Sequence, residues 1–137
     1  MHAQDDSHKV LLVDDSWYIQ LLVQDLLGAE GYDVVCVRDG TEAVNAYGAE
    51  EPDVVLMDII LPDLDGFDAC MRIRELDPDA QVVFMTGLLD DFTRIKASEV
   101  GATGFLPKPI SADDLAKAVS LAAAKRDLLA CGLQPPG

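Results

Sequence analysis

Five short, unbroken apolar runs recur along the chain, and each is followed by a segment with helical features. The runs lie at about 10–13, 34–37, 54–57, 82–85 and 103–106. Strands that are covered on both faces read as continuous hydrophobic stretches, and parallel neighbours need a connection, usually a helix, between them. The alternation therefore predicts an α/β domain in which helices cover both faces of a five-stranded parallel sheet.

Five helices are expected between and after these runs. The second and fourth are expected at about 41–47 and 90–100, and the last runs from an N-cap at Ser111 to about Ala130. Residues at helical spacing mark the faces that should turn inward. These residues are Ile19, Leu22, Val23 and Leu26 in the first helix, Phe67, Cys70 and Met71 in the third, and Leu115, Ala118, Val119 and Ala122 in the last.

The length and charge of the chain limit what it can do. Its 137 residues fit one domain, and no run is long enough for a membrane span or a signal peptide, so we expect a cytoplasmic protein. The net charge of −15 argues against direct binding to nucleic acid or to an anionic membrane. We expect a disordered lead at 1–8, the folded domain at 9–124, and a helix extension with a tail at 125–137.

The residues that follow the apolar runs carry the chemistry. Ligands bind outside the carboxyl ends of the strands in open α/β sheets, and those positions hold Asp14, Asp15, Asp58, Thr86 and Lys108. Close carboxylates repel unless a cation lies among them, and an oxygen-rich pocket with open positions suits Mg²⁺. A carboxylate beside Mg²⁺ can attack a phosphoryl group, whose oxygens a lysine and a threonine can stabilise. No glycine-rich loop is present, so one phosphoryl group fits better than a nucleotide.

Each of these residues also has a purely structural explanation. Asp14 and Asp15 could cap the following helix, where acidic side chains are common. Asp58 could be an ordinary strand-end residue, Thr86 a turn hydroxyl and Lys108 a solvated surface charge. Because all of these residues fall at the ends of four strands, a shared functional site is favoured over separate structural roles.

The order and spacing of these residues resemble response-regulator receiver domains of two-component signalling. The resemblance covers about Lys9 to Ala124 and implies a doubly wound, flavodoxin-like sheet of order 2-1-3-4-5 with five helices. The motifs that carry it are Val-Asp14-Asp15-Ser, Met-Asp58-Ile-Ile-Leu-Pro62-Asp-Leu-Asp-Gly66, Met-Thr86-Gly87 and Phe105-Leu-Pro-Lys108-Pro109.

The resemblance implies a phosphoacceptor site. Asp58 would take a phosphoryl group from the phosphohistidine of a histidine kinase or phosphotransfer protein. Mg²⁺, with Mn²⁺ as a substitute, would be held by Asp15, Asp58 and the backbone carbonyl of Ile60, with Asp14 nearby or acting through water. Lys108 would pair with the phosphoryl oxygens. Such a chain is no enzyme in the ordinary sense, because it catalyses only its own phosphorylation and dephosphorylation.

The resemblance also implies a switch. Thr86 would move toward the phosphoryl group and Phe105 would turn inward, which repacks the face formed by helix four, strand five and helix five. That face would signal to a partner or to an output domain. The Lys108–Pro109 bond matches one that is usually cis in this family.

Three departures from the pattern give finer hypotheses. Ile60 and Leu88 are apolar where polar residues can orient the hydrolytic water, so we expect slow dephosphorylation; the alternative is that they only shape a docking surface.

Trp17 and Leu21 lie off the apolar stripe of their helix and are candidates for docking the phosphodonor, although Trp17 could instead pack over a neighbouring loop. The last helix carries extra apolar residues that could form a dimer contact, lead to an output module, or simply fray; they are Leu121, Leu128 and Leu129.

Two rival functions use the same residues differently. Asp63-Leu64-Asp65-Gly66 superficially fits a haloacid-dehalogenase-type phosphatase, but it follows Pro62 in a loop and not an apolar strand. The second rival is a degenerate receiver that binds partners without phosphorylation. The presence of all three acidic residues, Asp14, Asp15 and Asp58, argues against it.

Overall fold

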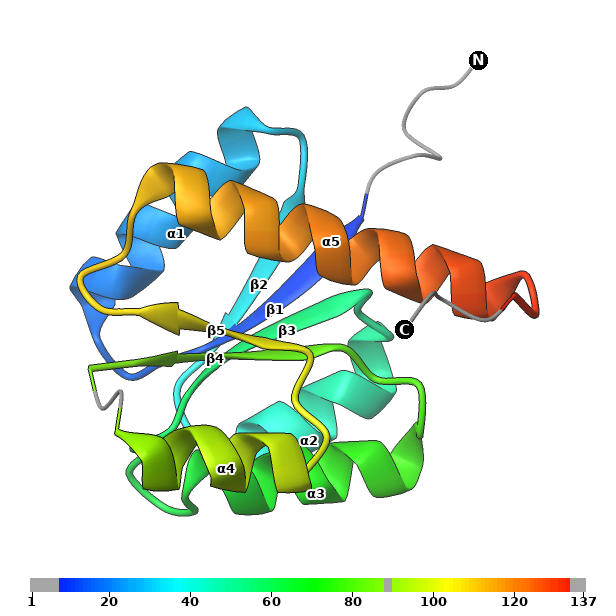
Figure 1. Ribbon diagram of the computed structural model, residues 1–137. Helices are drawn as coiled ribbons and strands as arrows, with labels where there is room; N and C mark the ends of the chain where they lie inside the picture. The colour runs from blue at the N-terminus through cyan, green and yellow to red at the C-terminus, as the bar shows by residue number, and fades with distance from the viewer. Residues whose placement is uncertain (1–7, 88–89, 134–137) are drawn as a thin grey trace.

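The sheet has the predicted parallel architecture. The computed structural model describes residues 8–87 and 90–133, and within them five parallel strands lie in the order β2-β1-β3-β4-β5 (Figure 1). This order confirms the predicted doubly wound topology. The strands are β1 (Lys9–Val13), β2 (Asp33–Val37), β3 (Val54–Asp58), β4 (Val82–Thr86) and β5 (Gly104–Pro107).

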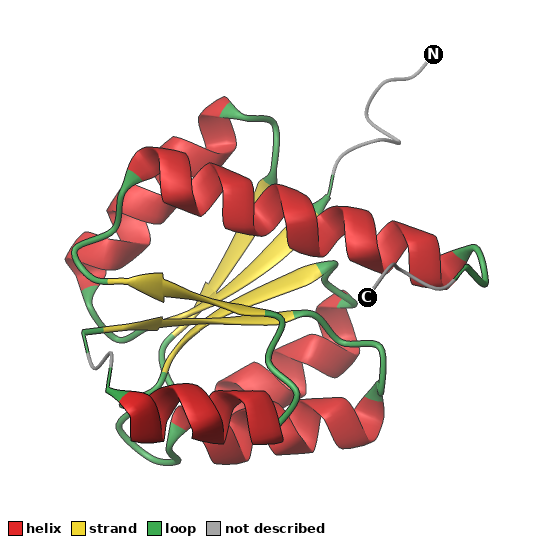
Figure 2. Cartoon of the chain, viewed as in Figure 1, coloured by secondary structure: helices red, strands yellow, loops and turns green. Residues whose placement is uncertain are grey.

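Helices cover both faces of this sheet, as Figure 2 shows. α1 and α5 lie on one face, and α2, α3 and α4 lie on the other. The helices are α1 (Trp17–Ala29), α2 (Gly40–Glu50), α3 (Gly66–Leu76), α4 (Asp91–Glu99) and α5 (Ala112–Ala130). In the described part of the chain, no helix is both long and apolar enough to cross a membrane.

The core consists of two layers, one on each side of the sheet. Successive strand residues point to opposite faces, so Leu11 and Val13 contact the α2–α3–α4 layer while Val10 and Leu12 contact the α1–α5 layer. All four residues are fully buried. This double burial is the physical reason that the apolar runs are continuous in the sequence.

A short polar side chain caps the N-terminus of each described helix. Ser16, Asp39, Asp65, Asp90 and Ser111 each accept a hydrogen bond from a backbone N–H in the first turn. The cap predicted at Ser111 is therefore confirmed. The α1 cap is Ser16, so Asp14 and Asp15 are not needed for that role.

Some helix faces and bounds differ from the prediction. Met71 is 48% exposed, because the buried face of α3 is centred between Cys70 and Ile73 and Met71 lies on its far side. In α1 the fully buried pair is Val23 and Leu27, which turns the inward face slightly from the predicted stripe. α2 continues to Glu50, beyond the predicted end at Tyr47.

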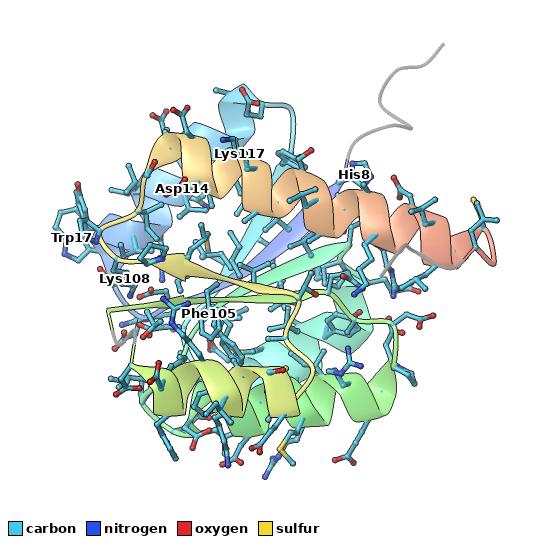
Figure 3. The ribbon with its side chains drawn as sticks, in the orientation of Figure 1. His8, Trp17, Phe105, Lys108, Asp114 and Lys117 are labelled. Carbon is cyan, nitrogen blue, oxygen red and sulfur yellow. The ribbon has the colours of Figure 1, made fainter. Side chains whose placement is uncertain are left out.

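The two ends of the domain lie close together. Of the predicted disordered lead, residues 1–7 lie outside the described residues, and His8 is half-buried against α5, where its Nε2 lies 3.0 Å from Asp127 Oδ2. In α5, Leu121 is exposed while Leu128 and Leu129 are half-buried. Figure 3 shows His8 beside the C-terminal half of α5.

Candidate functional site

A pocket opens at the carboxyl ends of the strands, at the edge where the sequence places its polar strand-end residues. Asp15, Asp58, Ile60, Thr86 and Lys108 all line it. Topology explains the convergence, because parallel strands end at the same edge of the sheet and β1, β3, β4 and β5 each deliver a residue there. The pocket is completed by Leu61, Pro62 and Gly87.

Lys108 joins two of the carboxylates. Its Nζ donates to Asp14 Oδ2 at 3.0 Å and to Asp58 Oδ2 at 2.9 Å. The lysine follows β5, where its backbone N–H donates to the carbonyl of Thr86, and the Lys108–Pro109 peptide is cis, as predicted. The alternative of a solvated surface lysine therefore fails.

The electrostatics of the site keep this lysine charged. Burial by itself lowers the pKa of Lys108, but the hydrogen bonds and charges of Asp58 and Asp14 outweigh burial and raise the pKa above its ordinary value of 10.5. One ammonium thus pairs with two carboxyl groups and can compensate only one negative charge.

The three acidic residues have different environments. The Asp14 side chain is only 1% exposed, and its Oδ1 accepts the backbone N–H of Ser16 at 2.9 Å. The Asp58 side chain is 15% exposed, and its Oδ1 accepts the N–H of Ile60 at 3.1 Å. Asp15 is exposed and faces the pocket. Asp58 therefore has one oxygen held by a backbone N–H and the other by Lys108.

One contributor to the site has no clear sequence signal. Gln20, in the second turn of α1, donates from Nε2 to the backbone carbonyl of Asp14 at 2.7 Å. This bond fixes the turn that carries the two acidic residues after β1. A glutamine on a helix surface is ordinary in sequence, and only the fold shows what it contacts.

The two predicted switch residues lie on neighbouring strands. Thr86, at the end of β4, is buried and reaches the pocket. Phe105 on β5 is half-buried and packs against the core next to Phe84, with ring centroids 6.4 Å apart. Figure 3 shows Phe105 and Lys108 along the same strand and its exit.

The predicted docking residues lie on the surface beside this end of the sheet. Trp17 is 71% exposed, and Leu21 and Tyr18 are also exposed. The exposure of Trp17 fits docking better than packing over a loop, and its ring meets that of Tyr18 edge-on at 6.2 Å. Tyr18 was not among the residues that the sequence singled out for docking, and it is exposed beside them.

The Asp-x-Asp-Gly stretch has a different role from the one that a phosphatase would need. Asp65 caps α3 by accepting the N–H of Asp68 at 2.8 Å. Asp63 accepts the backbone N–H groups of Gly40 and Thr41 at the N-terminus of α2, at 2.8 Å and 2.9 Å. Both carboxylates thus accept hydrogen bonds at helix N-termini, and neither directly follows a strand.

The oxygen donors of the pocket fit a hard divalent cation, although no ligand cage is preformed. Among residues 8–87 and 90–133, no group of three or more His, Cys, Asp or Glu side chains is arranged to hold a metal ion. Mg²⁺ needs only one or two carboxylates, because it keeps waters and takes phosphate oxygens as further ligands. Asp15 and Asp58 supply carboxylates of that kind at the pocket wall.

The comparison with known families agrees with this geometry. The response regulator receiver domain matches residues 10–120 of the chain. The chain belongs to this family. It is therefore a receiver domain, a signalling domain of two-component systems.

Relatives of this receiver domain occur alone and within longer proteins. It is 32% identical over 115 residues to the chemotaxis protein CheY of Bacillus subtilis, covering 83% of this chain and 96% of that protein. It is 40% identical over 111 residues to the "Probable transcriptional regulator ycf27" of Guillardia theta, covering 81% of this chain but only 43% of the regulator. The chain thus spans less than half the length of that regulator.

A solved structure agrees with the fold. The crystal structure of a response regulator receiver domain protein from Clostridium thermocellum superposes with a TM-score of 0.83 at 31% identity. The superposition covers 89% of this chain and 98% of that one.

Proposed function

We propose that this receiver domain accepts a phosphoryl group on Asp58 from the phosphohistidine of a histidine kinase or phosphotransfer protein. The observation that carries the proposal is the Asp58 carboxylate, which lies at the pocket wall between the Ile60 N–H and the Lys108 ammonium. A carboxylate held in this way is oriented and still partly accessible to a donor. Asp14, Asp15, Thr86 and Lys108 then have distinct roles around it.

The transfer exchanges one bond for another. An Asp58 carboxylate oxygen attacks the phosphorus, a P–O bond forms and the P–N bond to the histidine breaks. The electron pair of the P–N bond stays on the ring nitrogen, and the ring leaves as neutral imidazole because its other nitrogen already carries a proton. Negative charge builds on the phosphoryl oxygens during the step, and positioned donors stabilise it. Lys108 supplies an ammonium and Thr86 supplies a hydroxyl from the adjacent strand ends.

The cation proposed for this step is Mg²⁺, with Mn²⁺ as a substitute. Asp15, Asp58 and the backbone carbonyl of Ile60 would hold it, with Asp14 nearby or acting through water because its side chain is almost fully buried. When bound, the cation neutralises charge on the carboxylates and on the phosphoryl oxygens. Across the described residues, 8–87 and 90–133, no cationic side chain pairs with Asp15 as Lys108 pairs with Asp58.

Phosphorylation would be read on the α4–β5–α5 face. New phosphoryl oxygens recruit Thr86 and Lys108, and the movement of Thr86 frees space beside Phe105. The structure adds two exposed apolar residues on α4, Phe92 and Ile95, to the candidates for this face. The receiver would signal through them to a partner protein, an output domain or a second copy of itself.

We also propose that the phosphorylated state is long-lived. The side chain of Ile60 is exposed at the pocket and cannot hold a hydrolytic water, and Leu88, the second residue of this hypothesis, lies outside the described residues. Polar substitutions at both positions should speed the loss of the phosphoryl group. A rate that falls in such a variant would refute this explanation.

The test is incubation with Mg²⁺ and a small acyl phosphate, followed by intact-protein mass spectrometry. We expect one acid-labile phosphoryl group per chain, and its loss in Asp58→Asn. Asp25→Asn is the matched control, because Asp25 is an exposed acid on α1. Catalytic turnover of the phosphodonor without retained label would favour the phosphatase, and no label in the wild type would favour the degenerate receiver.

A further inference from the structure

The loop between β3 and α3 carries part of the proposed phosphorylation site. We call residues 59–65 the acceptor loop. Its second residue, Ile60, donates its N–H to Asp58 Oδ1 and contributes to the pocket wall. Small movements of this loop would therefore change both the orientation of the Asp58 carboxylate and the position of the Ile60 carbonyl.

The C-terminal end of the acceptor loop is closed by Gly66. Its N–H donates to the carbonyl of Ile59, and a Cβ at this glycine would lie 2.5 Å from the carbonyl oxygen of Asp58. This close approach holds the two ends of the loop together. The contact between Gly66 and Ile59 does not fix the middle of the acceptor loop, which needs a separate contact.

Asp63 fixes the middle of the loop to a different helix. Its Oδ1 accepts the N–H of Gly40 at 2.8 Å, and its Oδ2 accepts the N–H of Thr41 at 2.9 Å and the Thr41 hydroxyl at 2.6 Å. The Thr41 hydroxyl is the main reason that the pKa of Asp63 lies well below its ordinary range. Asp63 stays ionised at any pH near neutrality.

Packing reinforces these hydrogen bonds. Gly40 is buried against the next loop residue, and a Cβ at Gly40 would lie 2.9 Å from Leu64 Cβ. The N-terminus of α2 and the acceptor loop are therefore in direct contact through both polar and apolar groups.

The N-terminus of α2 has a second, local cap. Asp39 accepts the N–H of Glu42 at 2.8 Å, which is the ordinary arrangement for an N-cap. Two carboxylates thus share the free N–H groups of one helix end, and a negative charge there is favoured by the helix dipole. Only Asp63 belongs to the acceptor loop.

We propose that Asp63 is a positioning residue for phosphorylation, which anchors the acceptor loop to the N-terminus of α2 so that the Ile60 backbone stays in place beside Asp58. Asp63 does not contact the phosphoryl group or the cation in this role. The inference rests on the proposed function for its consequence, but the anchoring itself can be measured without it.

The experiment compares four variants of the full chain. Asp63→Ala removes the anchor. Asp39→Ala removes a carboxylate from the same helix end and leaves the loop contact intact. Asp63→Asn removes the charge but keeps a side chain that accepts hydrogen bonds at a helix N-terminus. Thr41→Val removes only the shortest of the three bonds and serves if Asp63→Ala folds poorly.

Two readouts separate positioning from simple helix capping. Hydrogen–deuterium exchange of peptides spanning 59–66, without Mg²⁺, reports the loop directly. Titration calorimetry with MgCl₂ and the rate of labelling by a small acyl phosphate report the site.

We expect about tenfold faster loop exchange and about tenfold weaker Mg²⁺ binding in Asp63→Ala, the scale for losing a group that orients a metal ligand. Asp39→Ala should leave both values close to wild type. Asp63→Asn keeps one of the two acceptor oxygens and Thr41→Val keeps both backbone bonds, so both variants should lie between Asp63→Ala and wild type.

Several results would overturn the inference. Equal effects of Asp39→Ala and Asp63→Ala would mean that Asp63 only caps α2. Unchanged loop exchange in Asp63→Ala would mean that the anchor does not hold the loop, and Asp63→Asn matching wild type in both readouts would mean that the paired acceptor oxygens are not what holds it. A wild type that neither binds Mg²⁺ nor takes the label contradicts the proposed function instead, and the exchange data then decide the anchoring alone.

Discussion

Replacing Asp77 by alanine should reveal how α5 is tied to the opposite layer of the domain. Asp77 follows α3, and its Oδ2 accepts both the Tyr47 hydroxyl of α2 at 2.7 Å and Arg126 of α5 at 2.8 Å. Its Oδ1 accepts the N–H of Asp79 at 3.0 Å. Because α5 lies across the sheet from α2 and α3, this one carboxylate joins the two layers at the edge opposite the Asp58 pocket.

The magnitude follows from what the substitution leaves behind. The Tyr47 hydroxyl belongs to a buried residue and would lose its partner, which costs about 1–2 kcal/mol. The Arg126 pair is partly exposed and adds about 0.5 kcal/mol, and the bond to the Asp79 N–H adds about as much again. We expect a loss of about 2–3 kcal/mol in the free energy of unfolding.

This loss translates into a measurable melting shift. An unfolding entropy of about 2.1 cal/mol/K per residue gives roughly 0.3 kcal/mol/K for a chain of 137 residues. The Tm of Asp77→Ala should therefore fall by about 7–10 °C at pH 7. Tyr47→Phe, which removes one hydroxyl, should lower it by about 3–4 °C.

The effect should depend on pH in a defined direction. Burial raises the pKa of Asp77, but the hydrogen bonds from Tyr47, Asp79 and Arg126 outweigh burial and lower the pKa below its ordinary value of 3.8. A carboxylate with a lowered pKa stabilises the folded state above the unfolded pKa, and this contribution is lost as the pH falls through the folded-state pKa. The Tm difference should thus be constant from pH 7 to 5 and shrink below pH 4.

Calorimetric melting of the wild type, Asp77→Ala and the exposed neighbour control Asp79→Ala provides the assay. A Tm for Asp77→Ala within 2 °C of wild type at pH 7 would refute the energetic argument. A difference that persists unchanged at pH 3 would show that the ionised carboxylate is not the cause. Labelling by a small acyl phosphate should be unaffected, since the network lies far from the pocket.

Three further predictions concern the site and its surroundings. Gly66→Ala places a Cβ 2.5 Å from the backbone oxygen of Asp58, so it should destabilise the fold by about 1–3 kcal/mol in urea titrations and slow phosphorylation. Trp17→Ala with Leu21→Ala should change the free energy of unfolding by at most about 0.5 kcal/mol, while transfer from the cognate phosphodonor falls and labelling by a small acyl phosphate does not. Lys108→Met leaves two carboxylates without their cation and should cost about 2–4 kcal/mol at pH 7. This cost should shrink as the pH rises through the raised pKa of the lysine, above 10.5.

The strand pattern illustrates what local sequence can predict. Each apolar run became a strand, because burial on both faces demands side chains such as those of 10–13 and 54–57 whatever their neighbours are. The site residues were predictable for the same reason: a polar residue directly after a buried strand must lie at the sheet edge. The cap at Ser111 was predictable because a helix N-terminus depends on residues within one turn.

Contacts between distant segments were not predictable in this way. Asp63 was noticed only within the receiver motif and a possible phosphatase motif, and nothing in the sequence relates it to Gly40. Met71 was placed inward because its spacing from Phe67 fits a helix face, but spacing does not say on which side of Phe67 the core lies. That choice depends on where the sheet and α2 are.

The sequence by itself determined the class of fold, the number of strands and the identity of the acidic, hydroxyl and lysine residues at one edge, because periodicity and strand ends are local properties. Only the tertiary structure decided that Lys108 joins Asp14 to Asp58, that Asp63 anchors the acceptor loop, and that one carboxylate ties α5 to α2. Such bonds join residues 22 to 94 positions apart, and their energy depends on atomic distances that exist only after the chain has folded.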